Sequence, residues 1–293
     1  MGKSLKKHLS IEEQVDLLES RGLTIEDRNE ALRFLEHVNY YRFSGYLFAF
    51  RDPEQENHYL QGSSFHQLSR IYEFDAKFAR ILMYALEDVE ETLKTRLSYT
   101  LSAYDPDDPL VYLSDEIYRP GADLNRFRES FDSAVRKNKN LPFVRHHLEH
   151  YDGKLPIWVA VEILTMGNVC FMYDNLIPSL QKSIAAKYHT GPVQLENWIR
   201  NLTYTRNHLA HYMRTYDYSF GRIPKACRNH SMNAVYRGKI FDQVAVMSFL
   251  FSTSENWNGY VLEEIEKLFS SYRDSVKIDA LGFPKDWKTV LRI

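Results

Sequence analysis

The sequence contains few of the residues that cross-link a chain or interrupt its helices. Among 293 residues there are two cysteines, Cys170 and Cys227, together with 12 glycines and 10 prolines. Two isolated cysteines lack the close spacing of a zinc site, and they are typical of a reducing compartment. Scarce glycine and proline favour helices over a β fold, which needs many tight turns. These shortages argue against a disulfide scaffold and make a helical protein the expected class.

The sequence also lacks an excess of charge of either sign and has no long hydrophobic run. The formal net charge is -2, so any binding of nucleic acid must depend on local basic patches. No apolar stretch approaches the roughly 20 residues that cross a bilayer. The first residues, MGKSLKKHLSIEEQ, are charged with no apolar run behind them, so neither a signal peptide nor an anchor is expected. We therefore expect a soluble, cytoplasmic protein without membrane association.

Hydrophobic spacing predicts helices along most of the chain. Between Phe65 and about Ala103, apolar residues recur every three or four positions, which predicts one long helix. Ser10 and Glu13 have the spacing of a capping box, which predicts a helix that Gly22 ends. Further helices are expected over 25–38, 123–151 with a break at Pro142, 178–189, 192–216 and 237–273, and loops over 53–64 and 217–232.

This pattern predicts an all-α fold with one domain over 1–293. A helical extension at the N-terminus, residues 1–60, is expected to precede a helical core over 65–293. No internal repeat, low-complexity tract or linker divides the chain further.

The most informative segment is RNHLAH, residues 206–211. On an ideal helix, Arg206 lies on an apolar stripe, whereas Asn207 and His211 project from nearly the opposite side, about 140° from Arg206. A guanidinium on an apolar stripe requires a carboxylate, a phosphate or a water-filled cleft, because an isolated buried charge is costly. A two-fold dimer or a kinked helix would bring both side chains to one phosphate, and the sequence does not choose between them. The stripe is formed by Leu195, Trp198, Leu202, Leu209 and Met213.

The surrounding sequence resembles the abortive-infection family of bacterial phage-defence and toxin proteins, within the HEPN superfamily of ribonucleases. HEPN ribonucleases carry an arginine, four to six residues and a histidine, usually with asparagine after the arginine, as in Arg206, Asn207 and His211. The resemblance covers nearly the whole chain. Lys94 departs from it, because relatives tend to have arginine there and lysine lacks the planar two-pronged donor. Its other matching segments are 39–46 (NYYRFSGY), 72–75 (YEFD), 86–90 (LEDVE), 156–158 (PIW), 161–162 (VE), 166–167 (MG) and 282–287 (GFPKDW).

The resemblance implies a HEPN-like helical bundle and an endoribonuclease that needs no metal or other cofactor. RNA carries its own nucleophile, the 2′-hydroxyl group, so cleavage requires only proton transfer and stabilisation of the phosphorane. His211 would act as general base or acid, because imidazole titrates near neutral pH. Arg206 would hold the scissile phosphate and Asn207 would orient it or His211. Such an enzyme releases 2′,3′-cyclic or 3′-phosphate ends.

The resemblance also implies an acidic partner for Arg206 on a neighbouring helix. Glu90 and Glu162 are equal candidates. His208 is a supporting residue, and with His211 it has the i, i+3 spacing of two metal ligands. No third ligand is nearby in the sequence, so no metal is expected.

RNA contacts outside the motif are expected at basic residues. Arg42 lies in an aromatic block, residues 40–50, that either stacks on bases or forms core. The other candidates are Lys94, Arg96 and Arg214.

The resemblance implies a toxin or phage-defence effector that acts as a homodimer and is restrained by an antitoxin protein or a small RNA. Two alternatives stay open from the sequence. One is an RNA-binding module without catalytic activity, and the other is a regulatory or antitoxin partner whose interface contains the motif.

Overall fold

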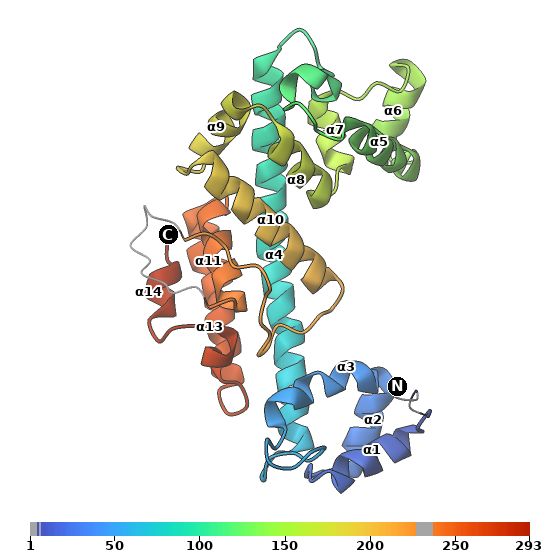
Figure 1. The fold of residues 1–293 in the computed structure, drawn as a ribbon, viewed down its shortest axis with the longest axis vertical. Coiled ribbons are helices and arrows are strands. Elements are labelled where there is room, and N and C mark those ends of the chain that lie inside the picture. The colour runs from blue at the N-terminus through green and yellow to red at the C-terminus, as the bar shows by residue number, and fades with distance from the viewer. Residues whose placement is uncertain (1–4, 6, 227–236) are drawn as a thin grey trace.

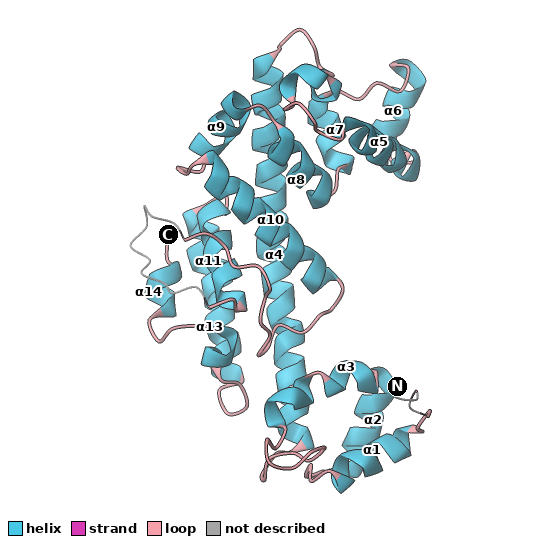
Figure 2. Ribbon diagram, viewed as in Figure 1, coloured by secondary structure: helices cyan, strands magenta, loops and turns pink. Residues whose placement is uncertain are grey.

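A computed structural model describes residues 5, 7–226 and 237–293, and over these residues the protein consists of helices and loops without a strand (Figures 1 and 2). The all-α prediction is therefore confirmed. Cys227 lies outside the described residues. The helices are α1 (Ile11–Ser20), α2 (Arg28–His37), α3 (Tyr40–Ser44), η1 (Tyr46–Phe50), α4 (Phe65–Tyr104), η2 (Val111–Leu113), η3 (Asp115–Ile117), α5 (Leu124–Asn138), α6 (Pro142–His150), α7 (Ile157–Ile163), α8 (Met166–Asn175), α9 (Pro178–Ala186), α10 (Pro192–Ala210), α11 (Ile240–Leu250), α12 (Ser254–Asn256), η4 (Trp257–Val261), α13 (Leu262–Ser271), η5 (Ile278–Leu281) and α14 (Trp287–Leu291).

Helix α4 is the axis of the molecule (Figure 1). It has 40 residues, as the apolar spacing predicted, and is therefore about 60 Å long. The Ser64 hydroxyl accepts the backbone N–H of Gln67 at 3.2 Å and caps its start. α7, α9, α10, α11 and α13 pack along α4, so most elements share one continuous core. No helix in the described ranges is long and apolar enough to cross a membrane.

The N-terminal helices surround the start of α4. The capping box is present, with the Ser10 hydroxyl accepting from the Glu13 backbone at 3.2 Å and the Glu13 carboxylate accepting from the Ser10 backbone at 2.7 Å. In the aromatic block, Phe43 is fully buried against Phe34 and Phe65, with ring centroids 5.1 and 5.2 Å away. Much of the aromatic block, residues 40–50, is therefore core, which was one of the two interpretations of its sequence.

The helical part predicted over about 237–273 is divided into several helices. α11 ends at Leu250, and a new helix begins after Thr253, whose hydroxyl accepts the N–H of Asn256. Between them, the Asp88 carboxylate on α4 accepts the backbone N–H of Ser252 at 2.7 Å and its hydroxyl group. The break is thus stabilised by a side chain far away in the sequence, which local spacing does not reveal.

Candidate functional site

Helix α10 presents the RNHLAH segment. Pro192 stands in its first turn, where a missing N–H costs nothing, and Leu195, Trp198 and Leu202 are buried against the core. The Trp198 indole N–H donates to the Lys225 carbonyl oxygen at 2.8 Å. α10 packs against α4, α8, α9 and α11, which fixes it against the core (Figure 1).

Arg206 meets Glu90 where α10 packs on α4. The Nε atom of Arg206 lies 3.7 Å from Oε2 of Glu90, and the other carboxylate oxygen, Oε1, lies 2.9 Å from Nζ of Lys94. The side chains of Glu90 and Lys94 are 17% and 16% exposed, whereas that of Arg206 is 39% exposed. Two cations therefore share one carboxylate, and the cluster keeps a net positive charge at the solvent boundary. This arrangement suits an anionic ligand.

Of the two acidic partners predicted for Arg206, the structure places Glu90 beside it. Glu162 is exposed on α7 and forms no ion pair with the residues that the structure describes. The alternative prediction, that Glu162 pairs with Arg206, is wrong. The residues on either side of Glu162, Val161 and Ile163, are buried in the core, and the Glu162 side chain itself faces solvent.

The end of α10 departs from the helix predicted through residue 216. Tyr212 has a φ of 56°, and its N–H donates to Leu209 O at 2.9 Å, while the Met213 N–H donates to His208 O at 3.0 Å. These two bonds form a Schellman motif, which ends a helix through a left-handed residue. Met213 consequently leaves the apolar stripe and is 54% exposed. His211 is the C-cap residue and is exposed, and its N–H still donates to Asn207 O at 3.0 Å, so helical bonding continues to this residue.

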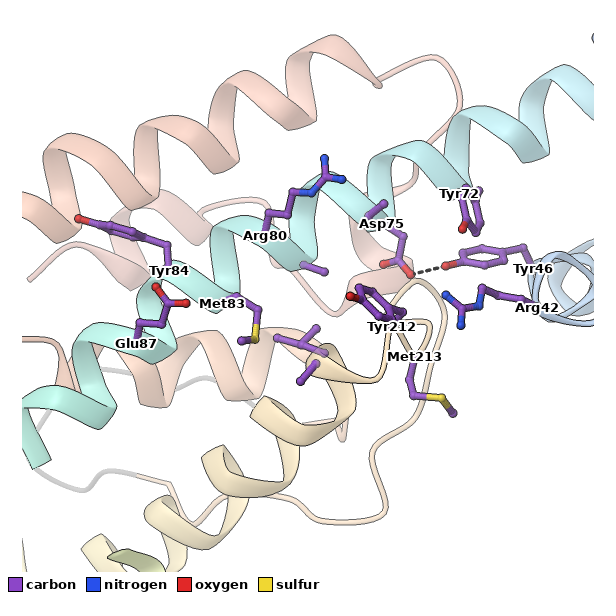
Figure 3. Close-up of a pocket in the computed structure, with 14 residues that line it drawn as sticks. Arg42, Tyr46, Tyr72, Asp75, Arg80, Met83, Tyr84, Glu87, Tyr212 and Met213 are labelled. Atoms are coloured by element: carbon purple, nitrogen blue, oxygen red, sulfur yellow. Dashed lines mark hydrogen bonds between the residues drawn. The ribbon is translucent and has the colours of Figure 1, made fainter. Parts of the chain in front are cut away.

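A buried carboxylate holds the loop that follows His211. Asp75 of α4 accepts the backbone N–H groups of Thr215 at 2.8 Å and Tyr216 at 3.0 Å, and the Thr215 hydroxyl group. It also accepts the Tyr46 hydroxyl group at 2.7 Å (Figure 3). Burial raises the pKa of Asp75, and these four donors oppose that rise. Asp75 therefore joins η1, α4 and the segment after α10 at one point. It was not singled out from the sequence.

His208 faces the interior. Its Nε2 lies 2.8 Å from the Arg214 carbonyl oxygen, and its ring packs 4.6 Å from Tyr218 and 5.2 Å from Phe220. His208 thus supports the loop rather than a ligand. No group of three histidine, cysteine or acidic side chains among the described residues could hold a metal ion.

The buried His208 should make stability sensitive to acid. Burial lowers the pKa of His208 below its ordinary value of 6.5, so the folded protein resists a proton that the unfolded chain accepts. This contribution to stability is complete above pH 6.5 and is lost as the pH falls below it. We expect the urea midpoint of His208→Gln to fall less than that of the wild type between pH 7.5 and 5.5. His150→Gln, a change at an exposed position on α6, is the control, and equal slopes in all three proteins would refute this expectation.

The remaining predicted residues lie in different environments. Asn207 is exposed beside Arg206. Arg96 donates to Lys187 O at 2.8 Å and stacks 4.0 Å from the Tyr188 ring, so it is engaged in packing, and its contact with RNA stays a prediction. Arg214 is half-buried with its guanidinium 5.9 Å from the Tyr46 ring. The RNA contact expected at Arg214 also stays a prediction.

A cavity of about 550 Å³ adjoins this site and was not foreseen (Figure 3). Arg42 of α3, the Asp75–Glu87 stretch of α4, and the residues on both sides of His211 line it. No sequence window contains all three segments, so only the fold brings them together.

The fold and the site define an all-helical protein with an exposed arginine and histidine at the end of a helix that crosses the central axis. The chain belongs to the family of Abi-like proteins, whose model matches residues 33–217. The match includes Asp75, Glu90, Arg206 and His211, whereas the segment 282–287 lies beyond it. No curated protein and no solved structure matches the chain. Membership of this family supports a role in abortive infection.

Proposed function

We propose that this Abi-like protein is a metal-independent endoribonuclease of the HEPN type that acts as an effector of abortive infection. The observation that carries the proposal is the environment of Arg206. Its Nε atom lies 3.7 Å from the Glu90 carboxylate, its side chain remains 39% exposed, and it stands five residues before the exposed His211. A structural arginine would be sealed by its carboxylate, whereas this one can bind a second anion.

The proposed chemistry uses the nucleophile that RNA supplies. A general base takes the proton of the 2′-hydroxyl group, whose oxygen attacks phosphorus, and the bond from phosphorus to the 5′-oxygen breaks. The departing 5′-oxygen receives a proton from a general acid, which leaves a 2′,3′-cyclic phosphate. Arg206 would stabilise the charge that develops on the phosphorane, and His211 would transfer one of the two protons.

One histidine for each chain favours a homodimer as the active form. His208 is buried and bonded to the Arg214 carbonyl, so His211 is the exposed imidazole in the described RNHLAH segment. Attack and departure of the two oxygens need a base and an acid on opposite sides of the phosphorus. A second copy would supply the second His211. A monomer would instead bind RNA with little cleavage, which is the alternative function that this observation supports.

A nuclease of this kind must be restrained in a resting cell. We therefore propose an antitoxin protein or a small RNA as a partner. The Lys94–Glu90–Arg206 cluster, with its net positive charge, is the part of the site that an anionic inhibitor would cover.

Removal of metal ions should leave the cleavage of RNA unchanged. The 2′-hydroxyl mechanism needs no metal-bound water, so the rate with EDTA should equal the rate without it, and the products should carry 2′,3′-cyclic or 3′-phosphate ends. Gel analysis of a labelled oligonucleotide before and after phosphatase treatment measures both. Activity that EDTA abolishes and Mg²⁺ restores would reject the mechanism, and a substrate with 2′-deoxy nucleotides is the control that should resist cleavage.

A further inference from the structure

The cavity beside α10 has unpaired arginines at its border. Neither Arg42 nor Arg80 forms an ion pair with any residue in the described ranges, although both line the cavity. The Arg42 guanidinium lies 5.5 Å from the centroid of the Tyr212 ring, and Figure 3 shows it directed toward that ring. Uncompensated guanidinium groups at the edge of a cavity favour an anionic ligand.

The walls of the cavity are aromatic and apolar. Tyr46, Tyr72 and Tyr212 surround the end that contains Arg42, and Met83 and Tyr84 lie further along α4 (Figure 3). A volume of about 550 Å³ is sufficient for a nucleoside. Flat aromatic faces together with arginine are the surfaces that proteins use to bind unpaired bases.

The cavity is lined by neighbours of the proposed catalytic residues, although neither Arg206 nor His211 lines it. Ala210 and Tyr212, the two neighbours of His211, both line it. At its other end, Glu87 lies one helical turn before Glu90, the partner of Arg206. An RNA strand with a phosphate at Arg206 and His211 would therefore bring an adjacent nucleotide to the cavity.

Tyr212 has an unfavourable backbone conformation in this position. Its φ of 56° belongs to the left-handed region, which glycine or asparagine usually occupies at the end of a helix. Its side chain is 75% exposed, so burial in the core does not explain the choice of tyrosine. Strained backbone conformations of this kind cluster at functional sites, which makes the Tyr212 side chain a candidate for a function.

The carboxylates of the cavity are compatible with a nucleotide. Asp75 already accepts four hydrogen bonds, so its charge is compensated. Glu87 is exposed at the far end and can accept from the amino group of a base.

We propose that this cavity binds an unpaired nucleotide of the RNA strand next to the bond that is cleaved. The base stacks on Tyr212 and Arg42, and the strand continues to Arg206. This inference rests on the proposed function for the identity of the strand. The cavity then determines which nucleotide stands beside the scissile phosphate.

The test measures binding without cleavage. A single-stranded 2′-O-methyl RNA that contains 2-aminopurine cannot be cut, and its fluorescence is quenched when the base stacks. The full-length wild type should quench it, and Tyr212→Gly should weaken binding about 10- to 100-fold, as expected for the loss of one stacked base. Glycine suits the left-handed conformation, so the turn after α10 should remain. Circular dichroism checks that it folds.

Two further variants make the result specific. Ala76→Trp, a change at an exposed position of α4 that lines the cavity, should fill it and abolish quenching. Tyr104→Ala, at the opposite end of the same helix, is the matched control and should bind as the wild type does.

Each outcome decides the proposal. The proposal would be overturned if the wild type did not quench the probe. It would also be overturned if Tyr212→Gly and Ala76→Trp quenched the probe as strongly as the wild type does. The monophosphate of 2-aminopurine riboside should bind more weakly than the oligonucleotide, and equal affinity would overturn the assignment to an RNA strand. A wild type that quenches the probe but cuts no RNA would refute the nuclease proposal and support the cavity.

Discussion

Arg206→Ala and His211→Ala should each lower the proposed rate of RNA cleavage by about 10²- to 10⁴-fold, the usual loss when one charge-stabilising or proton-transfer group is removed. Neither change should unfold the protein. Arg206 is 39% exposed, and its contact with Glu90 at 3.7 Å is too long for a strong hydrogen bond. His211 lies in solvent beyond the last residue of α10. Rates with a labelled RNA, together with thermal melting, separate the loss of catalysis from the loss of folding.

Matched controls exist within the same helix and for the same residue type. Arg200 is 48% exposed on α10, and it pairs with Asp174 and Glu196 rather than with Glu90. Arg200→Ala and His150→Ala should therefore retain the wild-type rate. Full activity in Arg206→Ala or His211→Ala would reject the proposed site. Equal losses of activity in the two control variants would show that the effect is not specific.

Asp75→Ala should destabilise the protein by about 3–5 kcal/mol, because it leaves four buried or partly buried donors without their acceptor. At roughly 2–4 °C for each kcal/mol, the melting temperature should fall by about 6–20 °C. Cleavage should fall as well, since Asp75 holds Thr215 and Tyr216, a few residues after His211. Denaturant titration and thermal melting measure the change.

The neighbouring Glu73→Ala provides the comparison for Asp75. Glu73 is 50% exposed on the same helix, so its replacement should change stability by less than about 1 kcal/mol. Thr215→Val removes only the hydroxyl group that donates to Asp75. Its loss of stability should therefore lie between those of Glu73→Ala and Asp75→Ala. If Asp75→Ala has the same melting temperature as the wild type, the Asp75 carboxylate does not hold the loop.

The fold was predictable where local rules decide it. The spacing of apolar residues in α4 and the Ser10–Glu13 capping box both act within one or two helical turns, and both are present. The end of α10 was missed because a left-handed tyrosine replaces the usual glycine, and Tyr212 gives no local stop signal. The place where the C-terminal helical part breaks after α11 was not predicted, because Asp88, 164 positions away, stabilises the break.

The site was predictable only in part, because contacts between residues far apart in the sequence also decide its geometry. The RNHLAH segment and the candidate Glu90 could be selected from the sequence, but the choice between Glu90 and Glu162 depends on which helix face meets α10. Asp75 did leave a signal, because it lies four residues after Ile71 and three before Phe78, inside the apolar stripe. A carboxylate in such a stripe requires buried donors. The cavity left no signal in the sequence, because its walls come from three segments that are far apart in the chain.

The central claim is that Arg206 and His211 act on the same phosphodiester bond, and a double-mutant cycle tests it most directly. Single-turnover cleavage is measured for the wild type, Arg206→Ala, His211→Ala and the protein with both changes. Groups that act together lose most of their effect with the first removal. The account predicts that the double variant is about as slow as the slower single variant. Losses that multiply across the two positions would show that the two side chains act independently, which contradicts the account.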